Sequence, residues 1–286
     1  MKPIFAVDIT EDKDNEQMPA ENFVGAVVRP ETADELDRLS EKTDDIIESA
    51  KPPILSRIAL GFSGIVCLLS FVFFVAGIEE AGFRAAFEKF SIILVLFVIT
   101  LAVTIVLAVF NYKRVKEVLT SAETDRVTNT FDAVLARAYE ELGVPEDAKE
   151  VDILCFWYKW KNGEPVFKAP NIAATSYVNM VKKIYARDGM LFMADSESRY
   201  DFKISDMHAI RTVKKRIPLF DWNKDEDYNK GEYKKYRITK DDKEVYYVKP
   251  YHILEMTVDG EEMGIYFPPY ELPVFEELTG LRAAEE

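Results

Sequence analysis

The sequence predicts an α+β membrane protein, in which a two-helix transmembrane hairpin precedes a cytoplasmic, antiparallel β-rich domain with a C-terminal helix. Two runs predict the hairpin, because residues 58–78 and 90–110 contain no charged side chain and each is long enough to cross a bilayer as a helix. The domain is predicted by β-forming runs between turn residues, which fill most of the chain after residue 150.

Composition excludes several classes of function. The 286-residue chain has a net charge of −14, whereas nucleic-acid binding needs basic surface to neutralise phosphates. The two cysteines, Cys67 and Cys155, do not suggest a disulfide framework. No nucleophile motif, metal-ligand spacing or nucleotide-binding loop is present in the sequence. We therefore expect no enzymatic activity, no cofactor, no metal site and no nucleic-acid partner.

Residues 1–57 are expected to form an acidic, cytoplasmic N-terminal segment. It contains two short β-like runs, at residues 4–10 and 22–28. A helical pattern then begins at Pro30, and the Pro52-Pro53 pair ends it before the first apolar run.

The membrane hairpin is expected to span residues 58–110. Each apolar run would be about 31 Å long as a helix, which matches a hydrocarbon core of about 30 Å. The connection at residues 79–89 can only join antiparallel helices. It holds two basic residues, whereas six flank the outer ends: Lys51, Arg57, Lys113, Arg114, Lys116 and Arg126. This asymmetry predicts a multi-pass plasma-membrane protein with both termini in the cytoplasm.

Small residues recur every four positions on both spans, at Ala59, Ser63, Cys67 and at Thr100, Thr104, Ala108. One interpretation is a packing seam, either of the hairpin or of a homo-oligomer or protein partner. The alternative is that the hydroxyls bond back to carbonyls of their own helix. Because neither span has an ionisable residue, a channel or pump made by this chain alone is not expected.

A juxtamembrane amphipathic helix is expected over residues 111–143. Thr120 and Glu123 have the spacing of a capping box that would restart the helix after the span. Gly143 and Pro145 are typical of a helix end.

Residues 144–286 are expected to form the β-rich domain. Asn162-Gly163 predicts a type I′ hairpin turn, and turns are also expected at Asp188-Gly189 and Asp259-Gly260. A final helix is expected to end at Gly280. The predicted strands are residues 151–161, 164–169, 177–186, 190–195, 199–204, 209–220, 233–239, 243–249, 252–258 and 261–267.

The segment YDFKISDMHAIRTVKKRIPL at residues 200–219 resembles the bacterial PH-like pattern. The order of two spans followed by such a domain also resembles uncharacterised bacterial two-span membrane proteins with a C-terminal bacterial PH-like domain. The resemblance covers residues 177–281 and the hairpin. It implies seven strands with a capping helix, and the extra hairpin at residues 151–168 departs from that layout.

Four basic residues are the candidate binding site, and we call them the basic patch: Arg211, Lys214, Lys215 and Arg216. The PH-like resemblance implies a lipid headgroup or an acidic peptide as ligand. The alternative is a solvated strand face that the acidic loop at residues 225–227 balances. Similarly, the aromatic residues Phe156, Tyr158 and Trp160 indicate either core packing or an exposed binding ledge.

These observations favour a non-enzymatic, membrane-anchored interaction or scaffold protein that presents a PH-like domain at the inner membrane face. Two alternatives stay open. One is an accessory subunit of a larger membrane transport or secretion assembly, and the other is an enzyme whose site is not recognised.

Overall fold

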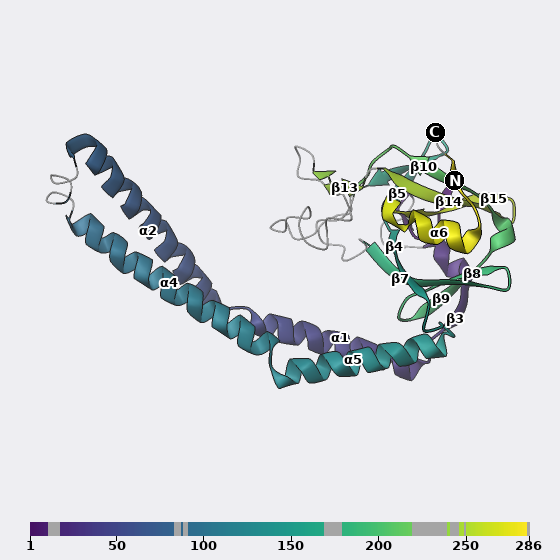
Figure 1. Ribbon diagram of the computed structural model, residues 1–286, viewed down its shortest axis with the longest axis horizontal. Coiled ribbons are helices and arrows are strands. Elements are labelled where there is room, and N and C mark those ends of the chain that lie inside the picture. The colour runs from purple at the N-terminus through teal and green to yellow at the C-terminus, as the bar shows by residue number, and fades with distance from the viewer. Residues whose placement is uncertain are drawn as a thin grey trace. The chain divides into compact units, whose positions relative to one another are not determined.

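A computed structural model describes residues 1–10, 18–82, 87, 91–168, 179–218, 239–240, 246–248 and 250–284 of the protein (Figure 1). The coarse fold class is confirmed, because two apolar helices, several β-sheets and a C-terminal helix are present. The predicted strand at residues 233–239 lies outside the described residues except for its last position. The same holds for most of the strand predicted at residues 243–249, of which Tyr246–Val248 is described as β13.

The chain divides into two compact units. The β-rich unit comprises Met1–Ala33 and Leu135–Glu286, and the helical unit comprises Asp34–Val134. This division differs from the expected one, in which residues 1–57 stood apart from a domain at residues 144–286. The reason is strand pairing: β1 and β3, near the N-terminus, pair with β15 and β9 from the other end of the chain. The helical unit is therefore an insertion within the β-rich unit.

Two five-stranded sheets form the body of the β-rich unit, in the orders β3-β9-β8-β7-β4 and β1-β15-β14-β10-β16. The strands of the first sheet are β3 Val24–Val27, β4 Lys149–Leu154, β7 Asn179–Arg187, β8 Met190–Ala194 and β9 Ser198–Lys203. Those of the second are β1 Lys2–Pro3, β10 Met207–Val213, β14 Tyr251–Val258, β15 Glu261–Phe267 and β16 Ala283–Ala284.

One hydrophobic core joins these sheets. Ile184 and Leu191 of the first sheet and Leu254 and Ile265 of the second belong to one buried cluster, and each is fully buried. Phe5, in the link that follows β1, is buried in the same cluster. Because its aromatic side chain packs there, the N-terminal segment stabilises the domain rather than extending from it.

Three hairpins follow the predicted turn chemistry. Asn162-Gly163 connects β5 (Trp157–Lys161) to β6 (Glu164–Lys168). Asn162, Asp188 and Asp259 have φ between 51° and 55°, and the glycine that follows each of them has φ between 77° and 85°. These are the left-handed values that a type I′ turn requires. The predicted turns at Asp188-Gly189 and Asp259-Gly260 are thus also confirmed, and they join β7 to β8 and β14 to β15.

The prediction of one strand over residues 151–161 is wrong. The chain leaves the first sheet after Leu154, and β5 pairs instead with β6 and with β2 (Val7–Asp8). Residues 151–158 are all buried, so no alternation between apolar and polar positions marks the break at Cys155 and Phe156. Of the N-terminal run predicted at residues 4–10, only Val7–Asp8 forms a strand, β2, and β1 precedes the run and joins a different sheet.

The C-terminal helix is confirmed as α6, Leu272–Thr279, which follows a short 3-10 turn at Pro269–Glu271. Gly280 ends it in the left-handed conformation, with φ 75°. Phe275 stacks on Phe267 of β15 with ring centroids 3.9 Å apart, and Figure 1 shows α6 beside these strands. The helix therefore closes the core from the side of the second sheet.

The remaining described strands are short. β11, Ile217–Pro218, and β12, Thr239–Lys240, both pair with β13.

The helical unit consists of two antiparallel helix pairs. α1 is Pro30–Ala50, α2 is Ile54–Ala81, α4 is Ser91–Leu119 and α5 is Ala122–Glu141. The predicted start at Pro30 and the end before Pro52 are confirmed. α2 and α4 are longer than the predicted spans, because each helix continues through polar residues beyond its apolar run.

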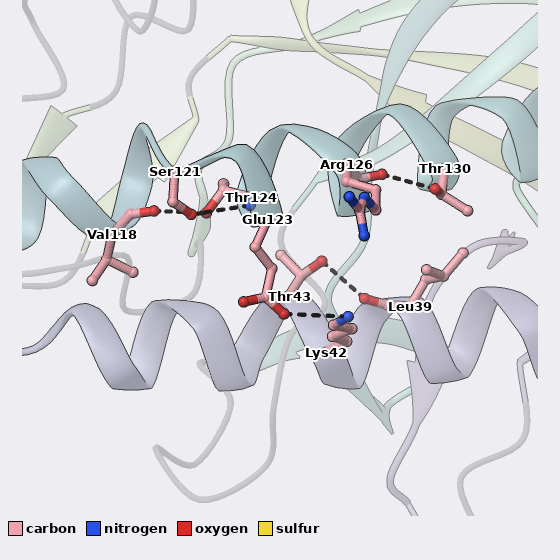
Figure 2. A network of polar contacts seen from close by, with 9 residues as sticks. All are labelled: Leu39, Lys42, Thr43, Val118, Ser121, Glu123, Thr124, Arg126 and Thr130. Atoms are coloured by element: carbon pink, nitrogen blue, oxygen red, sulfur yellow. Dashed lines mark hydrogen bonds and ion pairs between the residues drawn. The ribbon is translucent and has the colours of Figure 1, made fainter.

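The predicted capping box is displaced by one residue. Ser121 caps α5, because its Oγ accepts a hydrogen bond from the Thr124 backbone N–H at 3.2 Å (Figure 2). Thr120 instead donates its hydroxyl to the Lys116 carbonyl and completes the preceding helix. At the other end, the predicted stop is confirmed, because Gly143 follows α5 with φ 70°.

Candidate functional surfaces and a buried ion pair

The basic patch lies at the end of β10 and in the link that follows it. Lys214, Lys215 and Arg216 are exposed there. Arg211 forms an ion pair with Glu255 of the neighbouring strand β14, and the Lys215 ammonium lies 3.9 Å from the Glu164 carboxylate. These two pairs reduce the positive charge that the sequence suggested. The acidic loop at residues 225–227, which we considered as the balancing charge, lies outside the described residues.

The aromatic residues around β5 belong to the core, which confirms the first of the two interpretations given above for them. Phe156 and Tyr158 are 1% and 0% exposed, and both belong to a second buried cluster against which Trp160 packs. The Phe156 ring contacts Tyr266 of β15 edge-on, with centroids 5.0 Å apart. An exposed binding ledge is therefore excluded for Phe156 and Tyr158.

A buried lysine is the polar group that the sequence-based reasoning missed. Lys182 of β7 is 1% exposed, and its ammonium forms an ion pair with Asp195, which follows β8. The same ammonium lies 4.8 Å from the centre of the Tyr200 ring and 5.4 Å from that of Phe5. Lys182 and Ile184 are two residues apart in β7, so both side chains lie on its inward face. That position on an apolar face was the available signal.

Asp195 links this ion pair to the turn between β8 and β9. Its Oδ1 accepts hydrogen bonds from the backbone N–H groups of Glu197 and Ser198, at 3.0 and 2.7 Å. Burial raises the pKa of Asp195, but the Lys182 ammonium and these N–H groups lower it more, so that the pKa is below its usual 3.8. The carboxylate is therefore charged at neutral pH.

Cys155 lies close enough to Lys182 for the ammonium to favour its thiolate, yet burial dominates. Burial raises the pKa of the Cys155 thiol to about 12. The thiol is consequently protonated at neutral pH and is a poor nucleophile.

α1 and α5 connect the two units. Hydrogen bonds within the β-rich unit fix the start of α1 and the end of α5. Glu141 accepts hydrogen bonds from the Arg29 backbone N–H at 3.0 Å and from the Thr32 hydroxyl at 2.9 Å, so it caps the start of α1. The first of these bonds is the main cause of its lowered pKa. Arg199 of β9 donates to the Leu142 carbonyl at 2.7 Å, just after α5.

The same arginine is fixed by Asp201. The guanidinium donates to both carboxylate oxygens, at 2.7 and 3.0 Å, and lies over the Phe192 ring at 5.0 Å. Gly25 of β3 leaves room for this pair, because a Cβ there would lie 2.0 Å from Asp201 Oδ2.

Leu36 and Leu39 of α1 and Val127 of α5 are buried, and Leu39 and Val127 line one hollow. Lys42 of α1 faces Glu123 of α5 at 3.4 Å, as Figure 2 shows. Beside this pair is a shallow hollow of about 440 Å³, lined by Arg38, Leu39, Lys42, Arg126, Val127 and Thr130. The lining side chains come from both helices, so the hollow follows their seam.

α2 and α4 are long and apolar enough to cross a membrane. Their candidate spans are 26 and 29 residues long, and only 11% and 0% of their most apolar stretches are buried. A core helix of a soluble protein would be mostly buried. The exposure of these apolar side chains therefore favours membrane insertion.

The seam between α2 and α4 contains hydrogen bonds as well as small residues. Thr104 donates its hydroxyl to Ser63 Oγ at 3.0 Å, and Ser56 donates to Asn111 Oδ1 at 2.7 Å. The expected seam is confirmed at Ser63 and Thr104. Ala59 and Ala108 are exposed, so they do not belong to the seam within the hairpin, and a seam with a second copy or partner stays a prediction for them. The buried positions of α2 are Ser63, Ser70 and Gly77, so the true repeat is seven residues, which keeps one side facing an antiparallel partner.

Both interpretations of the hydroxyls hold at once. Thr100 bonds only to the Leu96 and Phe97 carbonyls of its own helix. The single Thr104 hydroxyl proton is shared between the Thr100 carbonyl, at 2.8 Å, and Ser63 Oγ across the seam, at 3.0 Å.

Among the described residues, no three or more His, Cys, Asp or Glu side chains are placed to hold a metal ion together. Comparison with protein-family models, curated proteins and solved structures found no match.

Proposed function

We propose that this protein is a non-enzymatic membrane anchor and scaffold that presents its β-rich unit at the cytoplasmic face of the plasma membrane. One observation carries the proposal: two exposed apolar helices form an antiparallel pair that is inserted within the β-rich unit. Because the chain leaves and re-enters the same unit, a hairpin that crosses the bilayer twice has both ends on one side. The excess of basic residues at those ends supports the cytoplasmic side.

The strand order supports a PH-like domain as the presented module. β4, β7, β8 and β9 form consecutive antiparallel pairs, and β10, β14 and β15 form a second antiparallel set, after which α6 follows. Seven strands with a capping helix is the layout that the resemblance implies for residues 177–281, and β4 lies before that segment. The β5–β6 hairpin and the N-terminal strands are additions to it.

The basic patch is the proposed contact of this module with an acidic partner or lipid headgroup. Lys214, Lys215 and Arg216 are exposed in one short link, where their charges favour an anionic ligand. Arg211 supports the link through its ion pair with Glu255. The triple change Lys214→Gln, Lys215→Gln and Arg216→Gln should reduce co-purification of a partner or binding to anionic vesicles. Unchanged binding would remove the patch from the proposal.

Topology is tested with single cysteines in a chain that carries Cys67→Ser and Cys155→Ala. Cysteines at Glu21 and Lys203, both exposed, should resist a membrane-impermeant maleimide in intact cells and react after lysis. A cysteine at Arg84, in the hairpin connection, should react in intact cells. Release of the chain from membranes by alkaline carbonate would refute the anchor itself.

The alternative of an accessory subunit in a larger membrane assembly rested on the small-residue seam. That seam lies between α2 and α4 of one chain, where Ser63 and Thr104 already bond to each other. Molecular mass in mild detergent separates the two proposals, because a monomer contradicts a stable assembly or homo-oligomer.

A further inference from the structure

Four exposed basic residues surround one end of the α2–α4 pair: Arg57, Lys113, Arg114 and Lys116. We propose that they form a belt that binds the phosphates of anionic phospholipids and thereby sets the depth of the hairpin in the membrane. The proposal rests on the membrane anchoring argued above. It adds a ligand class and a site to that anchor.

The belt lies at the same end of both helices. The hydrogen bond between Ser56 and Asn111, 2.7 Å long, fixes which turn of α2 faces which turn of α4. Arg57 directly follows Ser56, and Lys113 and Arg114 follow Asn111 within one turn. Residues far apart in the chain are thus brought to one end of the pair, with Lys116 further along α4 than Lys113 and Arg114.

The charges of the belt are available to a ligand. All four side chains are exposed, and none has an ion pair within the part of the chain that the structure describes. By contrast, Lys51, a few residues before α2, is paired with Glu48. A group of unpaired cations at this position, in a chain of net charge −14, attracts anions from outside the protein.

The adjoining surface identifies that partner as lipid. Val109 and Phe110, just before the belt, are 48% and 57% exposed, so the apolar exterior of α4 continues up to the basic residues. Tyr112 is 68% exposed among them, and tyrosine is enriched where hydrocarbon meets headgroups. Phosphates lie immediately outside the hydrocarbon, and long basic side chains reach them while their stems stay in apolar surroundings.

The test uses the full-length chain in vesicles of equal parts phosphatidylglycerol and phosphatidylcholine. After extraction in mild detergent, mass spectrometry gives the ratio of the two lipids that the protein retains. We expect phosphatidylglycerol to be enriched over the vesicle composition. The variant R57Q/K113Q/R114Q/K116Q should lose this enrichment, with a preference about fivefold weaker for each charge removed.

A matched control removes four basic residues from the β-rich unit, as K159Q/K161Q/R187Q/K203Q. It should retain phosphatidylglycerol as the unaltered chain does. High salt should reduce the phosphatidylglycerol enrichment of the unaltered chain and of the control variant, because it screens charges at the membrane surface. Equal enrichment in the belt variant and the control would overturn the belt. Release of the unaltered chain by alkaline carbonate would instead overturn the anchor, so the two failures are distinguishable.

Discussion

The β-rich unit and the helix pair bury polar side chains in different ways. In the β-rich unit, Lys182 is a full charge at 1% exposure, and it depends on Asp195 and two aromatic rings. In the helix pair, Ser63 is neutral at 7% exposure, and it bonds both to Thr104 and to the Leu60 carbonyl of its own helix. A hydroxyl that loses its partner keeps a local one and is neutral, whereas a carboxylate that loses its cation keeps its backbone hydrogen bonds but also an unneutralised charge. The same deletion should therefore cost much more in the β-rich unit.

The largest effect is expected from Lys182→Met. It leaves the Asp195 carboxylate without its cation, and removal of one partner from a buried ion pair costs about 3–5 kcal/mol. The control is Lys183→Met, because Lys183 faces the other side of the strand and its pair with Glu150 is largely exposed. Urea unfolding followed by tryptophan fluorescence measures both. A loss below about 1 kcal/mol for Lys182→Met would contradict the comparison.

A companion change sharpens this test. Asp195→Asn keeps an oxygen that can accept the turn hydrogen bonds from Glu197 and Ser198 but removes the charge. Added to Lys182→Met, it should recover part of the lost stability, because neutral groups then replace both ions. No recovery would mean that packing, and not charge, governs the site.

The next effect concerns the attachment of α5. Gly25→Ala would place a Cβ 2.0 Å from Asp201 Oδ2 and displace the carboxylate that holds Arg199. We expect a loss of about 1–3 kcal/mol from this overpacking. In the background of Asp201→Ala, the same change should cost far less. Additive losses in this double-mutant cycle would show that the steric contact is unimportant.

Local chemistry made the turns and helix ends predictable. Asn162-Gly163 and Gly280 each impose a backbone conformation through their own residues, so no distant contact is needed to read them. The two apolar spans were predictable for the same reason, because hydrocarbon accepts only long apolar helices. Of the candidate site, the sequence gives the residues of the basic patch but not the acidic partners that Arg211 and Lys215 find.

Distant pairing was not predictable. β1 and β2 are two residues each, too short for a pattern, and their positions depend on β15 and β5, which lie 150 or more residues away. Lys182 has a basic neighbour, Lys183, and only the alternation of β7 distinguishes the buried one from the exposed one. A shift of one residue in strand pairing moves every side chain to the opposite face. The sequence therefore could not show which of the two lysines is buried.

A smaller effect should appear as a pH dependence of the β-rich unit. Burial lowers the pKa of His252, and the nearby Glu276 only partly opposes this. A lowered histidine pKa means that the folded state favours the neutral ring. The resulting stability is fully present above pH 6.5 and is lost as the pH falls through the folded-state pKa.

The measurement is the free energy of unfolding between pH 7 and pH 5. It should fall by at most about 1.4 kcal/mol per pH unit from this one group. His252→Gln should flatten the curve in this range, while the contact with Thr212 can be kept by the amide. An unchanged slope in the variant would assign the pH dependence to other groups.

The smallest effect is expected in the helix pair, from Thr104→Val. The change keeps the shape of the side chain and removes its hydroxyl, which spans the seam to Ser63 at 3.0 Å. Interhelical hydrogen bonds of this kind contribute about 0.6 kcal/mol on average in membranes. Thr100→Val is the matched control, since the Thr100 hydroxyl bonds only within its own helix. SDS titration of the chain in mixed micelles measures both variants. Because Ser63 keeps its bond to the Leu60 carbonyl, we expect the two variants to differ by less than 1 kcal/mol. A loss comparable to that of Lys182→Met would mean that the helix pair depends on its polar seam as strongly as the β-rich unit depends on its ion pair.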